Sequence, residues 1–374
     1  MSGRPKGGTR MTVLVAGGGL IGLAVAWRAA QRGLDVTVVD EAPGSGASRA
    51  AAGMLAPLTE AAYGEEALRA LSRESLARYP AFLAELGGTV DLRTAGTLEV
   101  GFDADDMAAL DRLHAYYLES DLPVERLTGS QARRREPALS PRVRGALHAP
   151  SDHSVEPRSL HAALLTAAGA AGVHIVRSRI AALAVDGGRA TGLRLADGTA
   201  LTADTVVLAL GAWSGTLPGA PPLPVRPVKG QILRLRGDTL LDGTVRALVR
   251  GQHVYLVPYG TDGGLVVGAT SEELGFDPTV TAGAVHTLLR DAIEVVPDVA
   301  ELELVETLAR WRPGTPDNAP LLGPSALPGL VLATGHHRNG VLLTPATADA
   351  IAELLVEGAL PPFAAPFAPD GRMG

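Results

Sequence analysis

The stretch VLVAGGGLIGLAVAWRAAQRGLDVTVVDE, residues 13–41, decides the fold of this chain. Its apolar run Val13–Val15 is typical of a strand that is buried on both faces. A helix follows the glycines and stops at Gly33, a residue suited to the left-handed position after a helix. A second apolar run, Val36–Val39, ends in Asp40. The order strand, glycine turn, helix, strand predicts the opening βαβ unit of a parallel sheet.

The glycines of this stretch have the G-x-G-x-x-G spacing of dinucleotide-binding turns. The first permits the tight turn, the second lets the backbone approach a pyrophosphate, and the third lets the helix pack against the strand. The helix N-terminus offers N–H groups and a positive dipole end to phosphates, and the terminal acid can accept hydrogen bonds from ribose hydroxyls. An ordinary glycine-rich turn explains the glycines alone, but not the strands, helix and acid around them. The predicted dinucleotide contacts are Gly17, Gly19, Leu20, Ile21, Gly22 and Asp40.

The N-terminal region also has two features of a secretory signal peptide. Arg4, Lys6 and Arg10 precede an apolar run from Met11 to Trp27. However, three consecutive glycines interrupt that run, a strand ending in an acid follows, and no small-residue cleavage site precedes a fresh domain start. We therefore expect a flexible tail at residues 1–10 and a cytoplasmic protein.

Composition narrows the class of protein further. A chain of 374 residues has room for two domains, and its net charge of −7 argues against a nucleic-acid surface. No later segment reaches roughly 18 uninterrupted apolar residues, so we expect no membrane span. The absence of cysteine excludes disulfides, thiolate metal sites, a cysteine nucleophile and cysteinyl flavin attachment. The nine histidines form no metal-binding pattern, so we expect no metal site.

The rest of the chain adds a second architecture. Residues 228–269 alternate strands with turns and predict an antiparallel sheet, whereas residues 330–355 read as strand, glycine-rich loop and apolar helix. Such a late strand and helix suit a cofactor-binding sheet that the chain leaves and rejoins. We therefore predict an α/β fold with a Rossmann-like cofactor-binding domain and a second α+β domain built on an antiparallel sheet. The first domain is expected at residues 11–84, 146–219 and 308–368, and the second, for substrate, at 85–145 and 220–307.

Two further segments are candidates for cofactor contact. Residues 42–57 are small and nearly uncharged, which fits either a flexible loop leading into a helix or a backbone that lies against a flat ring system. Gly211 follows the buried strand Val206–Leu210, and its missing side chain can again admit a cofactor to the backbone.

Four sequence blocks carry a resemblance to a known family. They read GGGLIGLAVAWRAAQRG, GSGASRAAAGMLAP, RPGTPDNAPLLG and TGHHRNGVLLTPAT, in this order. The chain resembles the D-amino-acid-oxidase-like FAD oxidoreductases, and among them the glycine oxidases of the thiamine-biosynthesis type, from about Met11 to about Leu355. AAAGMLAP and GHHRNGVLLTPAT are the specific parts, because G-x-G-x-x-G occurs in many nucleotide enzymes.

The resemblance implies a noncovalently bound FAD in an extended form. Asp40 takes the position where the family usually has glutamate, and either carboxylate can accept from the ribose. The family positions expected near the pyrophosphate and the flavin are Ser48, Arg49, Ala52, Gly53, Met54, Arg338, Asn339, Gly340, Val341 and Leu342.

The resemblance also implies the substrate contacts. The family holds the amino-acid carboxylate with the arginine of R-P-G-T, here Arg312, whose planar guanidinium can grip both oxygens. Tyr255 would add a hydroxyl contact, with His253 and Arg338 nearby, and Arg338 is open to either flavin or substrate. A surface arginine, a packing tyrosine and a polar strand histidine are the alternative interpretations. After VVGAT this chain has Ser271 where the resembled family has methionine, which widens the expected substrate range.

The implied reaction is oxidative deamination of glycine, with possible extension to sarcosine or small D-amino acids. Hydride transfer to flavin N5 would give the imino acid, then glyoxylate and ammonia, and oxygen would yield hydrogen peroxide. A thiazole synthase would consume the imine in thiamine biosynthesis. The family resemblance also implies a homotetramer. The alternatives are a broader D-amino-acid or secondary-amine oxidase or dehydrogenase, a flavoprotein acting on modified tRNA, which the acidic balance disfavours, and a catalytically silent FAD- or NAD-binding scaffold.

Overall fold

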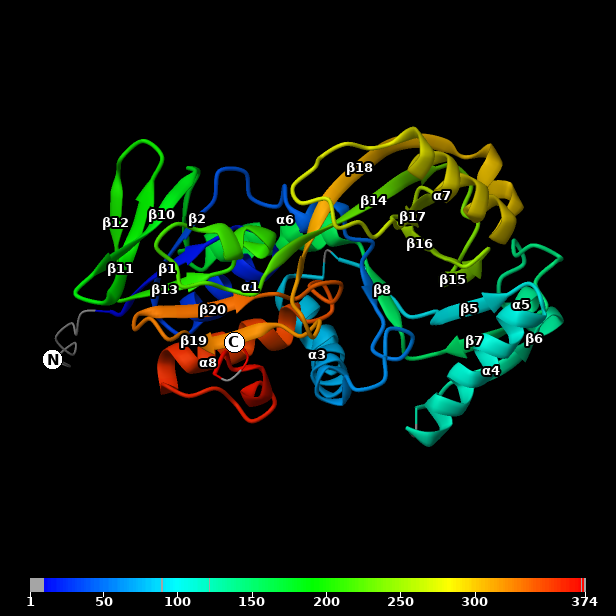
Figure 1. The fold of residues 1–374 in the computed structure, drawn as a ribbon, viewed down its shortest axis with the longest axis horizontal. Coiled ribbons are helices and arrows are strands. Elements are labelled where there is room, and N and C mark those ends of the chain that lie inside the picture. The colour runs from blue at the N-terminus through cyan, green and yellow to red at the C-terminus, as the bar shows by residue number, and fades with distance from the viewer. Residues whose placement is uncertain (1–9, 89, 121, 371, 373–374) are drawn as a thin grey trace, which may run out of the picture. The chain divides into compact units, whose positions relative to one another are not determined.

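The computed structural model describes residues 10–88, 90–120, 122–370 and 372. The chain folds into two compact units, each built from segments that are distant in sequence (Figure 1). Met1–Ser48, His161–Arg226 and Arg312–Gly374 form the first unit, and Arg49–Leu160 and Pro227–Trp311 form the second. The domain boundaries expected from the sequence stay a prediction. The flexible tail expected at residues 1–10 lies outside the described residues, apart from Arg10.

The first unit is organised on a mostly parallel sheet. Its strand order is β19-β20-β13-β1-β2-β9, with β1 paired in parallel to both β2 and β13, and β13 paired in parallel to the late strand β20. Only the edge strand β19 is antiparallel to its neighbour. The α/β fold with a parallel sheet predicted from the sequence is thus confirmed. The strands are β1 (Thr12–Ala16), β2 (Asp35–Val39), β9 (His174–Val176), β13 (Thr205–Leu208), β19 (Leu321–Pro324) and β20 (Leu330–Thr334).

Two helices of the first unit pack on each other beside this sheet. Helix α1 (Leu20–Gln31) contacts α8 (Thr344–Glu357), and an ion pair of 3.0 Å joins Arg28 to Asp349. Each helix is followed by a left-handed glycine, Gly33 after α1 and Gly358 after α8, as the sequence predicts for the first. The remaining elements are the antiparallel sheet β10 (Ile180–Asp186), β11 (Arg189–Leu195) and β12 (Ala200–Thr202), and the short helices η1 (Gly211–Thr216) and η3 (Ala365–Phe367).

The second unit is organised on an eight-stranded sheet in the order β18-β14-β17-β16-β15-β5-β7-β6. Its pairs between β14, β17, β16 and β15 are antiparallel, as expected, but β15 and β5 pair in parallel. No short turn joins those two strands, so the direction of pairing could not be predicted locally. The strands are β5 (Thr97–Gly101), β6 (Glu125–Thr128), β7 (Gly145–Ala149), β14 (Arg226–Arg236), β15 (Thr244–Val249), β16 (Gln252–Tyr259), β17 (Gly264–Gly268) and β18 (Glu303–Gly314).

Three of the described helices around the second sheet, α4, α5 and α7, begin at side chains that cap them. Asp103 caps α4 by accepting from Asp105 N and Asp106 N, while Asp106 accepts in return from Asp103 N. Thr128 caps α5 in the same reciprocal way with Gln131, whereas Thr281 caps α7 only by accepting from Ala284 N. The helices are α3 (Glu66–Glu85), α4 (Ala104–Glu119), α5 (Gly129–Arg135), α7 (Ala282–Val295) and η2 (Pro297–Glu301), while α2 (Ala47–Ala50) and α6 (Pro157–Ala170) span unit boundaries.

A small sheet in the second unit was not predicted. β8 (His153–Val155) pairs with both β3 (Met54–Leu55), inside the segment 42–57, and β4 (Leu92–Arg93). Strands of two or three residues have too little alternation to be seen in a sequence. These pairs fix the course of the segment after Ala52.

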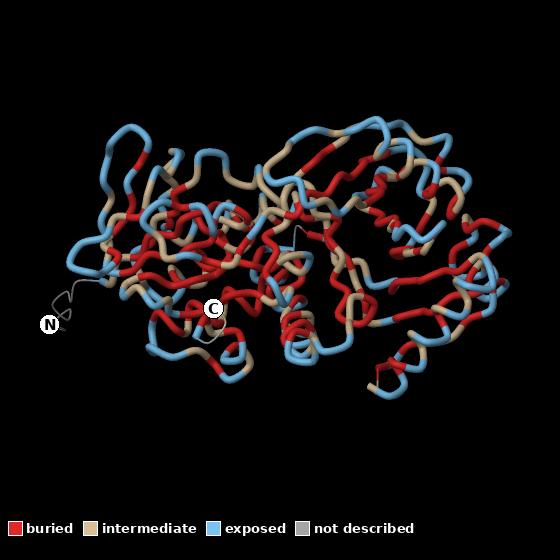
Figure 2. The backbone as a smooth tube through the Cα atoms, in the orientation of Figure 1, coloured by how far each residue is buried: buried red, intermediate tan, exposed pale blue. Residues whose placement is uncertain are grey.

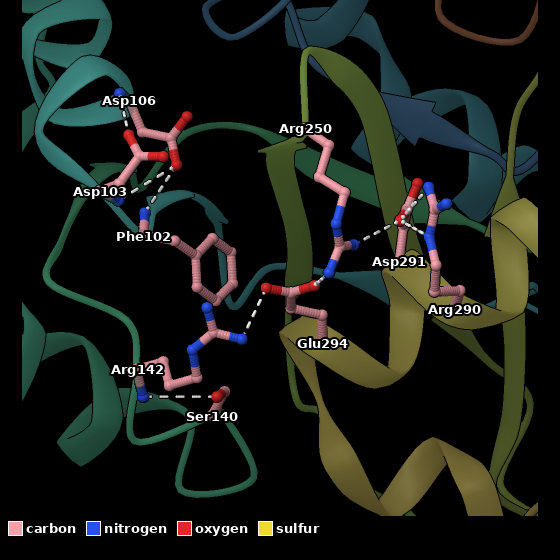
Figure 3. A network of polar contacts seen from close by, with 9 residues as sticks. All are labelled: Phe102, Asp103, Asp106, Ser140, Arg142, Arg250, Arg290, Asp291 and Glu294. Atoms are coloured by element: carbon pink, nitrogen blue, oxygen red, sulfur yellow. Dashed lines mark hydrogen bonds and ion pairs between the residues drawn. The ribbon is translucent and has the colours of Figure 1, made fainter.

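The helix α7 is fastened to the β15–β16 turn by charged side chains. Figure 3 shows Arg250, from that turn, between Asp291 and Glu294 of α7. Arg142 donates to the same Glu294 at 2.7 Å, and Arg290 pairs with Asp291, which is only 2% exposed. Apolar residues of α7 and of the strands form the core of this unit; in Figure 2 the buried residues are red. The strand β16 is therefore held at its start by both polar and apolar contacts.

Among the helices that the structure describes, none is long and apolar enough to cross a membrane.

Candidate functional site

The first unit brings four segments to one edge of its sheet. The glycine turn follows β1, Asp40 follows β2, Gly211 follows β13, and the loop 335–343 follows β20. Because these four strands run in parallel, their carboxyl ends meet at the same edge, which is where ligands bind in open α/β sheets. The topology therefore collects most of the predicted cofactor contacts in one place.

Glycine is sterically required at two positions of the turn. Gly17 has φ +109°, and a Cβ there would lie 2.4 Å from the carbonyl oxygen of Ala209. A Cβ on Gly22 would lie 1.9 Å from the carbonyl oxygen of Gly17. Gly19 is less crowded, because its Cβ would meet only Ser48 Oγ, at 3.3 Å. The turn and the first helical residues thus pack too closely for any side chain at Gly17 or Gly22.

The polar groups at this edge suit a phosphate and a ribose. Helix α1 begins after Gly19 without a side-chain cap and without an acid in its first turn, so its dipole end favours an anion. Ser48 Oγ accepts from Leu20 N at 3.2 Å. The Asp40 carboxylate accepts from Gly18 N at 2.6 Å and Ala42 N at 2.8 Å, which fixes it at the end of β2 with lone pairs to spare. The residues present therefore fit a dinucleotide.

The segment after Ser48 has a structural explanation that the sequence did not suggest. Arg49 pairs with Glu306 at 3.0 Å, so a carboxylate already engages this guanidinium. Gly53 has φ +91°, and a Cβ there would lie 1.8 Å from the carbonyl oxygen of Val155. The close approach that requires glycine at position 53 is thus to strand β8. Contacts of Arg49, Ala52, Gly53 and Met54 with the cofactor stay predictions.

The loop 335–343 is shaped by its own backbone. Asn339 N donates to His336 O, and His336 Nε2 lies 3.0 Å from Thr347 Oγ1 of α8. Burial lowers the pKa of His336 to about 3, so this ring is neutral at physiological pH. Val341 and Leu342 are buried, whereas Arg338 is exposed. The contacts of Arg338, Asn339, Gly340, Val341 and Leu342 with FAD stay predictions.

Gly211 is open on the side where its Cβ would stand. It has φ +57°, a Cβ added to it would meet no heavy atom within 4 Å beyond its chain neighbours, and its carbonyl accepts from Thr334 Oγ1 at 3.2 Å. That hydrogen bond joins the ends of β13 and β20, and the open side leaves room for a ligand.

The predicted substrate residues lie on strands of the second sheet and in the loop 335–343. His253 and Tyr255 are two residues apart on β16, so their side chains leave the same face of the strand. Arg312 is near the end of β18, with β14 and β17 between it and β16 in the strand order. Arg338 lies in the loop after β20. Tyr255 packs over Gly268 of β17, where a Cβ would be 2.4 Å from Tyr255 Oη.

A buried charge cluster beside Tyr255 was missed in the sequence. Arg246 of β15 is the register partner of both Tyr255 and Glu99, and it forms an ion pair with Glu60. Burial raises the pKa of Glu99, whose Oε2 has no hydrogen-bond partner among the described residues. Tyr117, to which the sequence assigned no role, buries its hydroxyl beside this cluster. The parallel β15–β5 pairing places Glu99 beside Arg246, and no local sequence pattern predicts that pairing.

We expect Gly22→Ala to abolish or strongly weaken FAD binding, because the new methyl group would overlap the Gly17 carbonyl at 1.9 Å and displace the turn. The measurement is the flavin-to-protein absorbance ratio of the purified variant, together with its thermal midpoint. Gly169→Ala in α6 is the control, since a Cβ there meets nothing within 4 Å and alanine favours a helix by about 1 kcal/mol. Normal FAD content in Gly22→Ala would contradict the assigned role of the turn.

Comparison with known proteins gives a consistent result over the whole chain. The family described as "DAO: FAD dependent oxidoreductase" matches residues 12–354. The glycine oxidase of Pseudomonas putida is 35% identical over 378 residues, which cover 97% of this chain and 99% of that protein. The crystal structure of glycine oxidase from Geobacillus kaustophilus has a TM-score of 0.89 and 34% identity, and the match covers 98% of this chain and 100% of that one.

A second kind of relative is longer than this chain. The "Bifunctional protein ThiO/ThiG" of Nostoc sp. is 34% identical over 361 residues, which cover 95% of this chain. This chain spans about half the length of that relative, 54%. The glycine turn, the carboxyl-edge site and the match across residues 12–354 lead to one conclusion: the chain belongs to the DAO family of FAD-dependent oxidoreductases and is an enzyme whose cofactor is FAD.

Proposed function

We propose that this chain is an FAD-dependent amino acid oxidase whose substrate is glycine. The products would be the imino acid, then glyoxylate and ammonia, with hydrogen peroxide formed from oxygen. One observation carries the proposal: a guanidinium, Arg312, and a phenol, Tyr255, lie on strands of one sheet in a flavoenzyme. A carboxylate is the group that such a pair recognises best.

The residues of the chain would bind and orient the substrate. Arg312 would grip both carboxylate oxygens, and the Tyr255 hydroxyl would donate to one of them, which leaves the α-carbon free to face the cofactor. His253 and Arg338 are proposed to stand near the amine or the flavin. When bound, FAD supplies the redox chemistry by accepting a hydride at N5 and passing two electrons to oxygen. A substrate with a neutral amine needs no dedicated base, and none is proposed.

A broader substrate range is the second candidate. Ser271 stands in the segment after β17, where the resembled glycine oxidases have methionine, and its side chain is exposed. A smaller side chain there favours sarcosine or small D-amino acids, with oxygen or another electron acceptor.

Partners and assembly follow from the relatives and stay proposals. The name of the bifunctional relative pairs this type of chain with a second protein, and we propose a thiazole synthase that consumes the imine in thiamine biosynthesis. We also propose a cytoplasmic homotetramer that binds FAD noncovalently.

The test is peroxide production by the purified protein with glycine in air, with the flavin absorption spectrum recorded in the same cuvette. We expect a yellow protein that forms peroxide. Bleaching of the flavin by glycine without peroxide would mean that the electron acceptor is not oxygen. A yellow protein that does not react with glycine would mean that the substrate is sarcosine or a D-amino acid. A protein that acts on none of these amines would refute the proposal.

A further inference from the structure

Lys229 of β14 has no exposed surface, which is unusual for a lysine. Its Nζ donates to Asp277 Oδ2 at 2.6 Å and lies 3.7 Å from Glu272 Oε2. The backbones of Lys229 and Glu272 also exchange two hydrogen bonds of 2.9 Å. Both acids belong to the segment 269–281, which follows β17. The lysine therefore lies under this segment and fastens it to β14.

Gln231, two residues further along β14, fastens the same segment at three more points. Its Nε2 donates to Glu272 Oε1 at 2.8 Å, its Oε1 accepts from Thr281 N at 2.8 Å, and its backbone N donates to Thr270 Oγ1 at 2.9 Å. The beginning, middle and end of the segment are thus all attached to two neighbouring positions of one strand. We name Lys229, Gln231, Glu272 and Asp277 the Lys229 cluster.

The segment begins beside Tyr255 and carries Ser271, which the proposed function places near the substrate. Gly268, under the ring of Tyr255, is the last residue of β17, and Ser271 follows three positions later. The hydrogen bonds of Thr270 and Glu272 stand on either side of Ser271. Any displacement of the segment would therefore move Ser271 and the backbone next to Tyr255.

A fully buried lysine is not the residue that stability alone would favour at this position. Taking a lysine out of water costs several kcal/mol, which its partners only partly return, and an apolar residue of similar size would often be as stable. Asp277 and Glu272 keep 34% and 25% of their side chains exposed, so the lysine is the one charged group of the cluster that is fully desolvated. Its hydrogen bonds are directional, which an apolar contact would not be, and this favours a role in placing the segment.

Building on the proposed function, we propose that the Lys229 cluster is a positioning device that holds Ser271 and the segment 269–281 beside Tyr255, and thereby restricts the size of the amine that is oxidised. Lys229 acts through the segment and does not touch the substrate. Loosening the segment would weaken binding of the small substrate glycine and relatively favour a bulkier amine such as sarcosine.

The test compares Lys229→Met with the wild-type holoenzyme. Methionine fills a similar space to lysine. Asp277 and Glu272, which lose their partner, are partly solvated, so we expect the variant to fold. The expected result is a KM for glycine raised about 10-fold or more, with kcat within about 3-fold of wild type, and a higher rate on sarcosine relative to glycine. Thr270→Val, a change of similar shape, removes the Gln231 N–H acceptor and should act in the same direction by about 3-fold. It keeps the test decisive if Lys229→Met does not fold.

Arg126→Met is the matched control, because it removes a surface ion pair with Asp111 in the same unit and touches neither the segment nor β16. It should leave both KM and the sarcosine-to-glycine ratio unchanged. A folded, yellow Lys229→Met with a lower thermal midpoint but wild-type KM and ratio would show a purely structural lysine and overturn the inference. Failure of the proposed function would be seen separately, as a wild-type protein that does not oxidise glycine. In that case the inference about substrate size would also be wrong.

Discussion

Arg312→Ala is expected to lower kcat/KM for glycine by about 30-fold to 5,000-fold, the equivalent of about 2–5 kcal/mol for a lost charged hydrogen-bond partner. Arg312 is the residue proposed to hold the substrate carboxylate, and glycine offers almost no other group for binding. Steady-state peroxide formation over a range of glycine concentrations measures the effect. A rise in KM with unchanged kcat would mean that the guanidinium binds ground and transition states equally.

Two further variants make the result specific to the arginine. Arg312→Lys keeps the charge but loses the planar fork, so its activity should fall between alanine and wild type. Arg236→Ala, on the neighbouring strand β14, removes a surface ion pair with Glu303 of β18. The two side chains are 49% and 65% exposed, so the change should leave the kinetics unchanged. Wild-type kinetics in Arg312→Ala would show that Arg312 does not bind the substrate.

Arg246→Met is expected to destabilise the protein by about 3–5 kcal/mol, because it removes the buried cation that lies against Glu60 and Glu99. Arg246 and Glu60 are 14% and 11% exposed, so solvent screens their interaction only weakly. Against a typical total stability of about 5–15 kcal/mol, this is a large loss. Chemical denaturation of the holoenzyme at a fixed FAD concentration measures it.

The loss should depend on pH in a defined direction. Without Arg246, the pKa of Glu99, already raised by burial, rises further, so the folded variant binds a proton where the unfolded chain does not. Stability of the variant then increases as pH falls through the raised pKa of Glu99, and the difference from wild type is largest above that pKa. A loss independent of pH would mean that packing, and not charge, accounts for the effect.

A surface pair and a second substitution serve as controls. Arg126→Met breaks an ion pair with Asp111, which is 62% exposed, and should cost at most about 1 kcal/mol. Adding Glu60→Gln to Arg246→Met should recover part of the loss, because it removes one of the stranded charges. No recovery would argue against the Glu60–Arg246 pair as the origin of the effect.

The parts of the fold that could be predicted from sequence are those with local causes. Gly17 and Gly22 are required by contacts within one turn, and Asp103, Thr128 and Thr281 cap helices through residues two or three positions away. Local causes of this kind leave a recognisable pattern among neighbouring residues of the sequence. The late strand β20 and helix α8 were also predicted, because strand, glycine-rich loop and helix follow each other directly.

The parts that escaped prediction have causes far away in the chain. Arg246 reads as an ordinary outward residue of an alternating strand, and only its pairing with Glu99 on β5 makes it buried. Lys229 is buried by a segment some 40 residues later. Gly53 likewise meets a distant partner, because a Cβ there would lie 1.8 Å from the carbonyl oxygen of Val155, while its expected cofactor contact stays a prediction. The assignments of Arg312 and Tyr255 came from resemblance, since neither spacing nor composition singles them out.

The interleaved order of the first unit has a consequence for synthesis on the ribosome. Strand β1, at residues 12–16, needs β13 as a neighbour, and β13 in turn needs β20, at residues 330–334. A growing chain of some 300 residues therefore carries an incomplete parallel sheet with an unpaired apolar strand, a state prone to aggregation. Domains usually fold one after another as they emerge, but here neither unit is contiguous, so the glycine turn gains its full support only after β20 has left the ribosome. Uptake of the flavin would then wait for that strand, whose synthesis would set the timing.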